Sequence, residues 1–195
     1  MIDDIITKTE VGALTREDAL YFEKLLRFGY LDEYEEWMNS CLQSEDPLSD
    51  IVLELSVCAS DFNKTISVLH NYCASQKADE SAVCDRLRLF FKDAYYSNRM
   101  TKEEITSVMY SLARDSGYPY DNDCDSWESM YYFHYYLPEA EEGYITMESF
   151  DEVFFSYLDD GIPFDTDSIR SKNNITVIHA DKPSFFDRIK RFFKR

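Results

Sequence analysis

The residues best suited to metal or acid–base chemistry are three aspartates that alternate in the segment DNDCD. Asp121, Asp123 and Asp125 match the first three ligand positions of a calcium-binding loop. Ser126 then stands where the sharp turn requires glycine, and Tyr132 stands where a bidentate glutamate should close the site. The pattern therefore favours an acidic capping loop, in which Asp125 or Ser126 begins the next helix, over a calcium site.

No other motif indicates catalysis or a cofactor. The three histidines (His70, His134 and His179) fall in separate segments, and His70 lies one helical turn from Cys73, as many pairs do by chance. The chain has no nucleophile elbow, zinc-protease, phosphate-loop or dinucleotide-binding motif. We expect a protein that is not an enzyme, with no catalytic residue, metal or cofactor. A hydrolase whose active site forms only when the chain folds is a further hypothesis, ranked third after the two binding functions given below.

The net charge directs attention to a protein partner. The chain has 20 Lys+Arg against 38 Asp+Glu, a net charge of −18. So acidic a surface disfavours direct nucleic-acid binding, because phosphate contacts need Lys and Arg. It suits either a basic protein partner or simple solubility. The candidate partner contacts are the two acidic clusters: Asp32, Glu33, Glu35 and Glu36, then Asp121, Asp123 and Asp125.

The C-terminal segment PSFFDRIKRFFKR has the opposite charge. Residues from Lys182 onward carry +5, which leaves −23 for residues 1–181. On a helical wheel one arc is apolar, and the charged residues fall outside it. These apolar side chains must be buried against another surface, which can be the acidic domain itself, a groove on a partner, or an anionic membrane surface. Its members are Phe185, Phe186, Ile189, Phe192 and Phe193, with Arg188, Lys190 and Arg191 among the basic residues beside them.

The elements that must position these residues are helices. Only 5 Gly and 5 Pro interrupt 195 residues, which favours long elements. Capping boxes at Thr15–Asp18 and Thr101–Glu104 predict two helix starts. Pro47 suits the first turn of another helix, Asp61 caps a further one, and an aromatic helix should stop before Pro138.

The spacing of apolar residues predicts an all-α fold, a single multi-helix bundle or helical-hairpin stack of seven or eight helices. We divide the chain into an acidic helical domain (1–160), an irregular linker with the short β-branched run ITVIH (161–183) and a basic amphipathic helix (184–195). The five cysteines, without a close pair, indicate free, mostly buried thiols. With no signal-peptide pattern and no apolar run near ~20 residues, we expect a cytoplasmic protein.

The aromatic segment YYFHYY (131–136) has two interpretations. A deeply buried helix with hydroxyls at its edges is the ordinary one and the one that we favour. The functional one is a binding surface, because tyrosine is enriched at interface hot spots.

Two segments resemble the bacterial DUF2247 family of uncharacterised helical proteins. LTREDALYFEKLLRFGYLDEYEEW is similar to its paired-helix start, and YPYDNDCDSWESMYYFHYYLPEAEEGY, with a helix ending FFSYL, resembles its aromatic block. The resemblance covers patches of residues 14–160, and the insertion around DNDCDS departs from it. By size, acidity and helical character, it implies an analogy with immunity proteins of bacterial toxin systems.

The leading hypothesis is therefore a cytoplasmic immunity-type protein that occludes a basic toxin domain. The alternative is a peripheral membrane or scaffold protein attached through residues 184–195.

Overall fold

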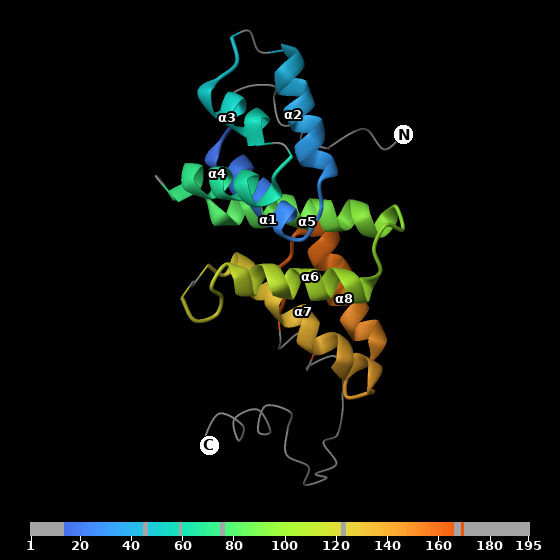
Figure 1. Ribbon diagram of the computed structural model, residues 1–195. Coiled ribbons are helices and arrows are strands. Elements are labelled where there is room, and N and C mark those ends of the chain that lie inside the picture. The colour runs from blue at the N-terminus through green and yellow to red at the C-terminus, as the bar shows by residue number, and fades with distance from the viewer. Residues whose placement is uncertain are drawn as a thin grey trace.

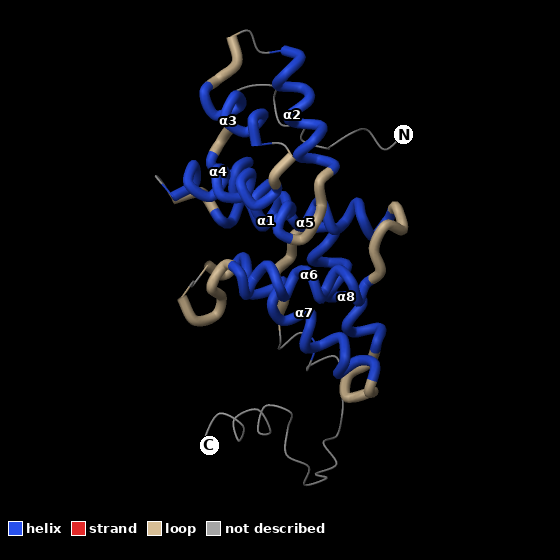
Figure 2. Tube along the Cα trace, in the orientation of Figure 1, coloured by secondary structure: helices blue, strands red, loops and turns tan. Residues whose placement is uncertain are grey.

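Helices form all of the regular structure in the part of the chain that the structure describes. A computed structural model describes residues 14–44, 47–58, 60–74, 77–121, 124–165 and 169. Within these ranges the chain forms eight helices joined by turns and loops, and no strand (Figures 1 and 2). The predicted all-α multi-helix fold is confirmed. The run ITVIH and residues 184–195 lie outside the described residues.

The longest helix, α5, separates the others into two groups. It packs against α1 on one side and against α7 and α8 on the other, and Figure 1 shows α1–α4 and α6–α8 on opposite sides of it. The most extensive helix pair is α6 with α7, and α1 with α4 is second. The helices are α1 (Arg16–Arg27), α2 (Asp32–Ser44), α3 (Asp50–Cys58), α4 (Phe62–Ala74), α5 (Glu80–Tyr96), α6 (Lys102–Asp115), α7 (Ser126–Glu141) and α8 (Met147–Asp160).

Local capping signals account for several helix boundaries. The Thr15 side chain accepts a hydrogen bond from the Asp18 amide, and Asp18 accepts one from the Thr15 amide, which completes the predicted capping box. Thr101 and Glu104 form the same reciprocal pair at the start of α6. Asp61 accepts a hydrogen bond from the Lys64 amide at the start of α4. These satisfy amides that a helix start would otherwise leave without a partner.

Two boundary predictions are wrong. Pro47 lies before α3, which begins at Asp50. Helix α7 does not stop before Pro138 but continues to Glu141, because the buried side chains of Leu137 and Ala140 hold its last turn in the core. Helix α7 does begin at Ser126, as predicted, and Asp125 occupies its N-cap position without a side-chain capping bond.

The core of the C-terminal group is aromatic. Phe133 of α7 has its ring centroid 5.3 Å from that of Phe154 and 5.3 Å from that of Tyr157, both on α8. Phe164, beyond α8, closes the cluster at 5.1 Å from Phe133, and its amide donates to Ser129 Oγ at 2.8 Å. Ile169 is also fully buried. The chain after α8 is therefore packed against α7.

Helix α1 is buried nearly all round and includes charged side chains. Leu20 and Phe28 are only half-buried, whereas Asp18, Glu23 and Lys24 are buried. Each buried charge has an opposite partner. The Lys24 ammonium lies 2.6 Å from Asp115 Oδ2, Arg27 Nη2 lies 2.7 Å from Glu23 Oε1, and Arg86 pairs with Asp18. These pairs connect α1 to α5 and to the end of α6.

Candidate functional site

Helix α7 presents a buried face and a half-buried face. The buried-helix interpretation of YYFHYY holds for the first face, and the binding-surface interpretation of the second stays a prediction. Phe133 and Tyr136 are buried in the core. Tyr131, Tyr132 and Tyr135 are half-buried, with part of each ring at the surface. Because these three occupy positions i, i+1 and i+4 of one helix, they share one exposed stripe.

The half-buried rings of α7 join others from α6 and from the loop between α6 and α7. Tyr131 is the centre of the group: its ring centroid lies 5.2 Å from Tyr110, 5.4 Å from Tyr118 and 5.2 Å from Tyr135. The imidazole of His134 stacks on Tyr110 at 4.6 Å. We call this group the tyrosine surface. It consists of Tyr110, Tyr118, Tyr131, Tyr132, His134 and Tyr135, all half-buried.

The hydroxyl groups of the tyrosine surface form a directed chain. Tyr135 donates to the Tyr110 hydroxyl oxygen at 3.1 Å, so the 3.3 Å contact between Tyr131 and Tyr135 has Tyr131 as its donor. Arg114 Nη1 also donates to the Tyr110 oxygen, at 2.9 Å. Tyr110 accepts in both bonds and keeps its own proton for a further acceptor. The chain therefore ends in a donor suited to a carbonyl or carboxylate on another molecule.

Titration does not change this arrangement near neutral pH. Burial and the bonds to Tyr110 and Tyr131 raise the pKa of Tyr135, and burial raises the pKa of Tyr132. Burial lowers the pKa of His134. The hydroxyls of Tyr132 and Tyr135 are consequently protonated and the imidazole of His134 is neutral at pH 7.

The acidic loop borders the tyrosine surface. Asp121 and Asp125 are exposed and Glu128 is half-buried, while Asp123 lies outside the described residues. Burial, with smaller contributions from the carboxylates of Glu128 and Asp125, raises the pKa of Tyr118 to about 12. Tyr120 in the same loop is 81% exposed. Carboxylates and aromatic rings thus share one end of the α6–α7 pair.

The described lysines and arginines all lie outside residues 115–169, and most of them are already paired with carboxylates. Seven of the eleven described lysines and arginines lie within 4.0 Å of a carboxylate. Residues 115–169 contain fifteen acids and no lysine or arginine. Of these acids, Asp115, Asp151 and Asp159 pair with lysines of other helices, and the stretch as a whole keeps a surplus of negative charge.

The other predicted acidic cluster, residues 32–36, lies on α2, away from the tyrosine surface. Asp32, Glu35 and Glu36 are exposed at the start of α2, whereas Glu33 is half-buried and accepts a hydrogen bond from the Tyr21 hydroxyl at 2.7 Å. Arg86 Nη2 is 4.0 Å from the same carboxylate. Helix α2 and the α6–α7 loop lie on opposite sides of α5 (Figure 1), so the structure does not bring the two clusters together.

His70 and Cys73 each have a separate partner. His70 Nδ1 lies 3.2 Å from Glu23 Oε1, and the Cys73 thiol contacts the Arg16 carbonyl oxygen at 3.6 Å. Burial, with the charge of Glu23 second, raises the pKa of Cys73 to about 11, which keeps the thiol protonated at neutral pH. The five cysteines, all within the described residues, form no disulfide bond, and Cys41, Cys58 and Cys84 are buried.

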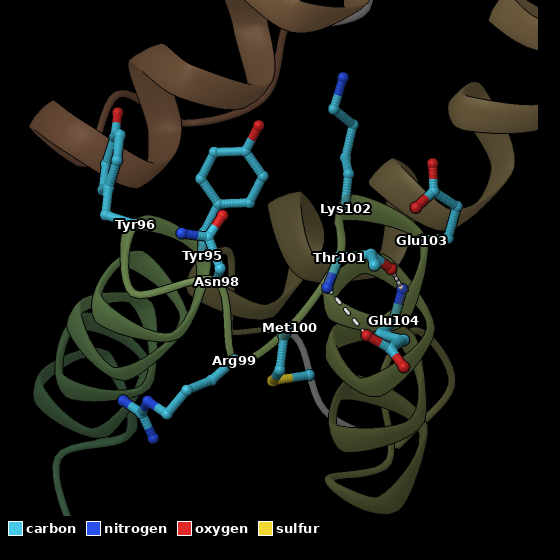
Figure 3. Close-up of a pocket in the computed structure, with 9 residues that line it drawn as sticks. All are labelled: Tyr95, Tyr96, Asn98, Arg99, Met100, Thr101, Lys102, Glu103 and Glu104. Carbon is cyan, nitrogen blue, oxygen red and sulfur yellow. Dashed lines mark hydrogen bonds between the residues drawn. The ribbon is translucent and has the colours of Figure 1, made fainter.

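A pocket of about 490 Å³, not foreseen from the sequence, lies at the α5–α6 turn (Figure 3). Its two cations do not converge: Figure 3 shows Arg99 and Lys102 pointing in different directions, and they pair with Asp93 and Asp151. Glu104 accepts from the Thr101 amide. These charged groups are used within the fold, so the tyrosine surface is the better candidate site. Tyr95, Tyr96, Asn98, Arg99, Met100, Thr101, Lys102, Glu103 and Glu104 line the pocket.

Within the described residues, no group of three or more histidine, cysteine or acidic side chains could hold a metal ion. Among the same residues, no helix is both long enough and apolar enough to cross a membrane. Comparison of the chain with models of protein families, with curated proteins and with solved structures found no significant match.

Proposed function

We propose that this chain is a non-enzymatic, cytoplasmic binding protein of the bacterial immunity kind. Its partner is a basic toxin domain, which it inhibits by covering part of the toxin's surface. The observation that carries the proposal is the tyrosine surface with its acidic border. Tyrosine provides large contact area at low entropic cost, and the surplus carboxylates attract a basic partner.

The burial and hydrogen bonds of the predicted acidic residues favour some of them over others as contacts with a partner. Glu33 serves an internal hydrogen bond with Tyr21, which makes it a poor candidate for a contact with a partner. The exposed Asp121 and Asp125 stand beside half-exposed rings, so electrostatic attraction and aromatic burial can act at one place. We therefore place the centre of the interface on the tyrosine surface, with Asp121 and Asp125 at its rim. Asp32, Glu35 and Glu36 of α2 lie across α5 from this surface (Figure 1), and we leave them outside the proposed interface.

The test is association with the terminal domain of a secreted protein encoded beside this chain's gene. Reversing two rim charges, Asp121→Lys with Asp125→Lys, should lower the association rate constant at low salt by about tenfold or more. It should also weaken the salt dependence of association. The matched control is Glu35→Lys with Glu36→Lys, which changes the same charge in the first turns of α2.

Two results would contradict the proposal. The first is failure of the purified domain to bind the wild-type chain at micromolar concentration. The second is an equal loss of association rate for both double variants, since a general charge effect would then replace a localised interface.

A further inference from the structure

The described chain ends beside the tyrosine surface. Phe164 stacks on Tyr132, with ring centroids 5.8 Å apart, and lies 4.9 Å from Tyr136. Ile169, the last described residue, is fully buried. The described chain after α8 therefore lies against α7, the helix that carries Tyr131, Tyr132 and Tyr135.

We propose that the basic tail (residues 184–195) docks on the tyrosine surface of its own chain. The sequence of the tail predicts one face of four phenylalanines and an isoleucine, bordered by lysines and arginines. The half-exposed rings of the tyrosine surface can contact the apolar face of the tail. The carboxylates of Asp121, Asp125 and Glu128 can pair with its lysines and arginines. Aromatic pairs in edge or offset geometry and charge attraction then act together.

The connection permits this contact. Fourteen residues, 170–183, separate the last described residue from the tail, and extended they reach about 45 Å. A tether of this length holds the tail near the surface at an effective concentration of about a millimolar. A second copy of the chain would bring another strongly acidic surface against the first, so charge favours the tail as the occupant.

Other apolar positions fit the tail less well. Leu53 and Val57 of α3 are 52% and 72% exposed. Helix α3, however, lies across α5 from α7, the helix against which Phe164 packs (Figure 1). If the proposed function holds, the docked tail covers the partner surface, and a partner must displace it. The docking itself requires no partner, so it is tested with the full chain alone.

The experiment is hydrogen exchange, followed by mass spectrometry, on the full chain without a partner. A tail docked nine-tenths of the time exchanges its amides about tenfold more slowly than an unstructured peptide of the same sequence. Isolated helices this short are marginal in water, so protection reports docking. The variant Asp121→Lys with Asp125→Lys should abolish most of the protection. Glu35→Lys with Glu36→Lys, which changes the same charge on α2, should leave it unchanged.

The outcomes distinguish the occupants. A tail that exchanges at the unstructured rate in the wild-type chain overturns the inference. Protection that both double variants lose equally, or that neither loses, places the tail elsewhere and also overturns it. An unprotected tail that becomes protected only with phosphatidylserine vesicles favours the membrane alternative. Protection without any binding of the toxin domain supports docking while contradicting the proposed function.

Discussion

The guanidinium of Arg86 lies 3.8 Å from the centroid of the Tyr21 ring and pairs with the Asp18 carboxylate. Asp18 also accepts from the Thr15 hydroxyl at 2.6 Å, within the capping box of α1. This contact joins the start of α1 to α5 through a cation, a ring and a nearly buried carboxylate.

Arg86→Met should destabilise the fold by about 3 kcal/mol, because it leaves the Asp18 carboxylate buried without its cation. Urea unfolding of the purified protein measures the loss. The control is Arg99→Met, which breaks the exposed pair with Asp93 and should cost less than about 1 kcal/mol. Equal losses for the two variants would mean that the α1–α5 contact is not a structural centre.

Alkaline pH should unfold the protein through its buried tyrosines. Burial raises the pKa of Tyr34 to about 12 and raises that of Tyr21, so the folded state favours the protonated forms. The resulting stability is fully present below pH 10, the ordinary tyrosine value, and is lost as pH rises through the folded pKa values. Tyr34 alone should contribute about 2–3 kcal/mol to that loss.

Urea midpoints measured from pH 9 to pH 12 check this prediction, together with the ultraviolet absorbance of tyrosinate. Tyr34→Phe should make the alkaline loss smaller. Tyrosines that ionise freely near pH 10 without unfolding would contradict the assignment.

Phe133→Ala should cost about 3–5 kcal/mol, since it removes a fully buried ring between α7 and α8. Thermal or urea unfolding followed by circular dichroism gives the value. Tyr144→Ala, at a ring that is 64% exposed in the α7–α8 turn, is the control and should change stability by less than about 0.5 kcal/mol. A small effect of Phe133→Ala would show that this aromatic cluster is not the core of the C-terminal group.

Tyr131→Ala should weaken partner binding by about 2 kcal/mol, or some thirtyfold in Kd, because Tyr131 is the centre of the tyrosine surface. Calorimetry with the toxin domain measures it, after urea unfolding confirms that the variant remains folded. Leu53→Ala, at an exposed position on α3, should leave Kd unchanged. If Leu53→Ala weakens binding and Tyr131→Ala does not, the interface lies on the α1–α4 side.

Signals that act within one helical turn could be predicted from the sequence, and the capping boxes at Thr15 and Thr101 are confirmed. The burial of α1 could not be predicted. Its charged partners Arg86 and Asp115 come from 68 and 91 residues further along the chain, beyond any periodic pattern. The error at Pro138 has the same cause, because core packing of its neighbours outweighs a local helix-breaking residue.

The candidate site was visible only in part. The sequence identified the ring cluster of α7 and the acidic loop, but it gave no reason to join Tyr110 to them. The one usable pattern was a shared spacing. Tyr110 and Arg114 are four residues apart, as are Tyr131 and Tyr135, so each pair lies on one face of its helix. Only the pairing of α6 with α7 places these two sets against each other.

The absence of lysine and arginine between Arg114 and Arg170 has a practical consequence for the laboratory. Trypsin cuts after basic residues, so a complete digest should leave residues 115–170 as one peptide that includes both α7 and α8. Amine-reactive dyes and coupling reagents must bypass this stretch as well. Among the described lysines, the exposed Lys64 and Lys77 lie in or beside α4, across α5 from α7. Attachment of the protein to a sensor through these two amines would hold it by the α4 side and leave α7 away from the point of attachment.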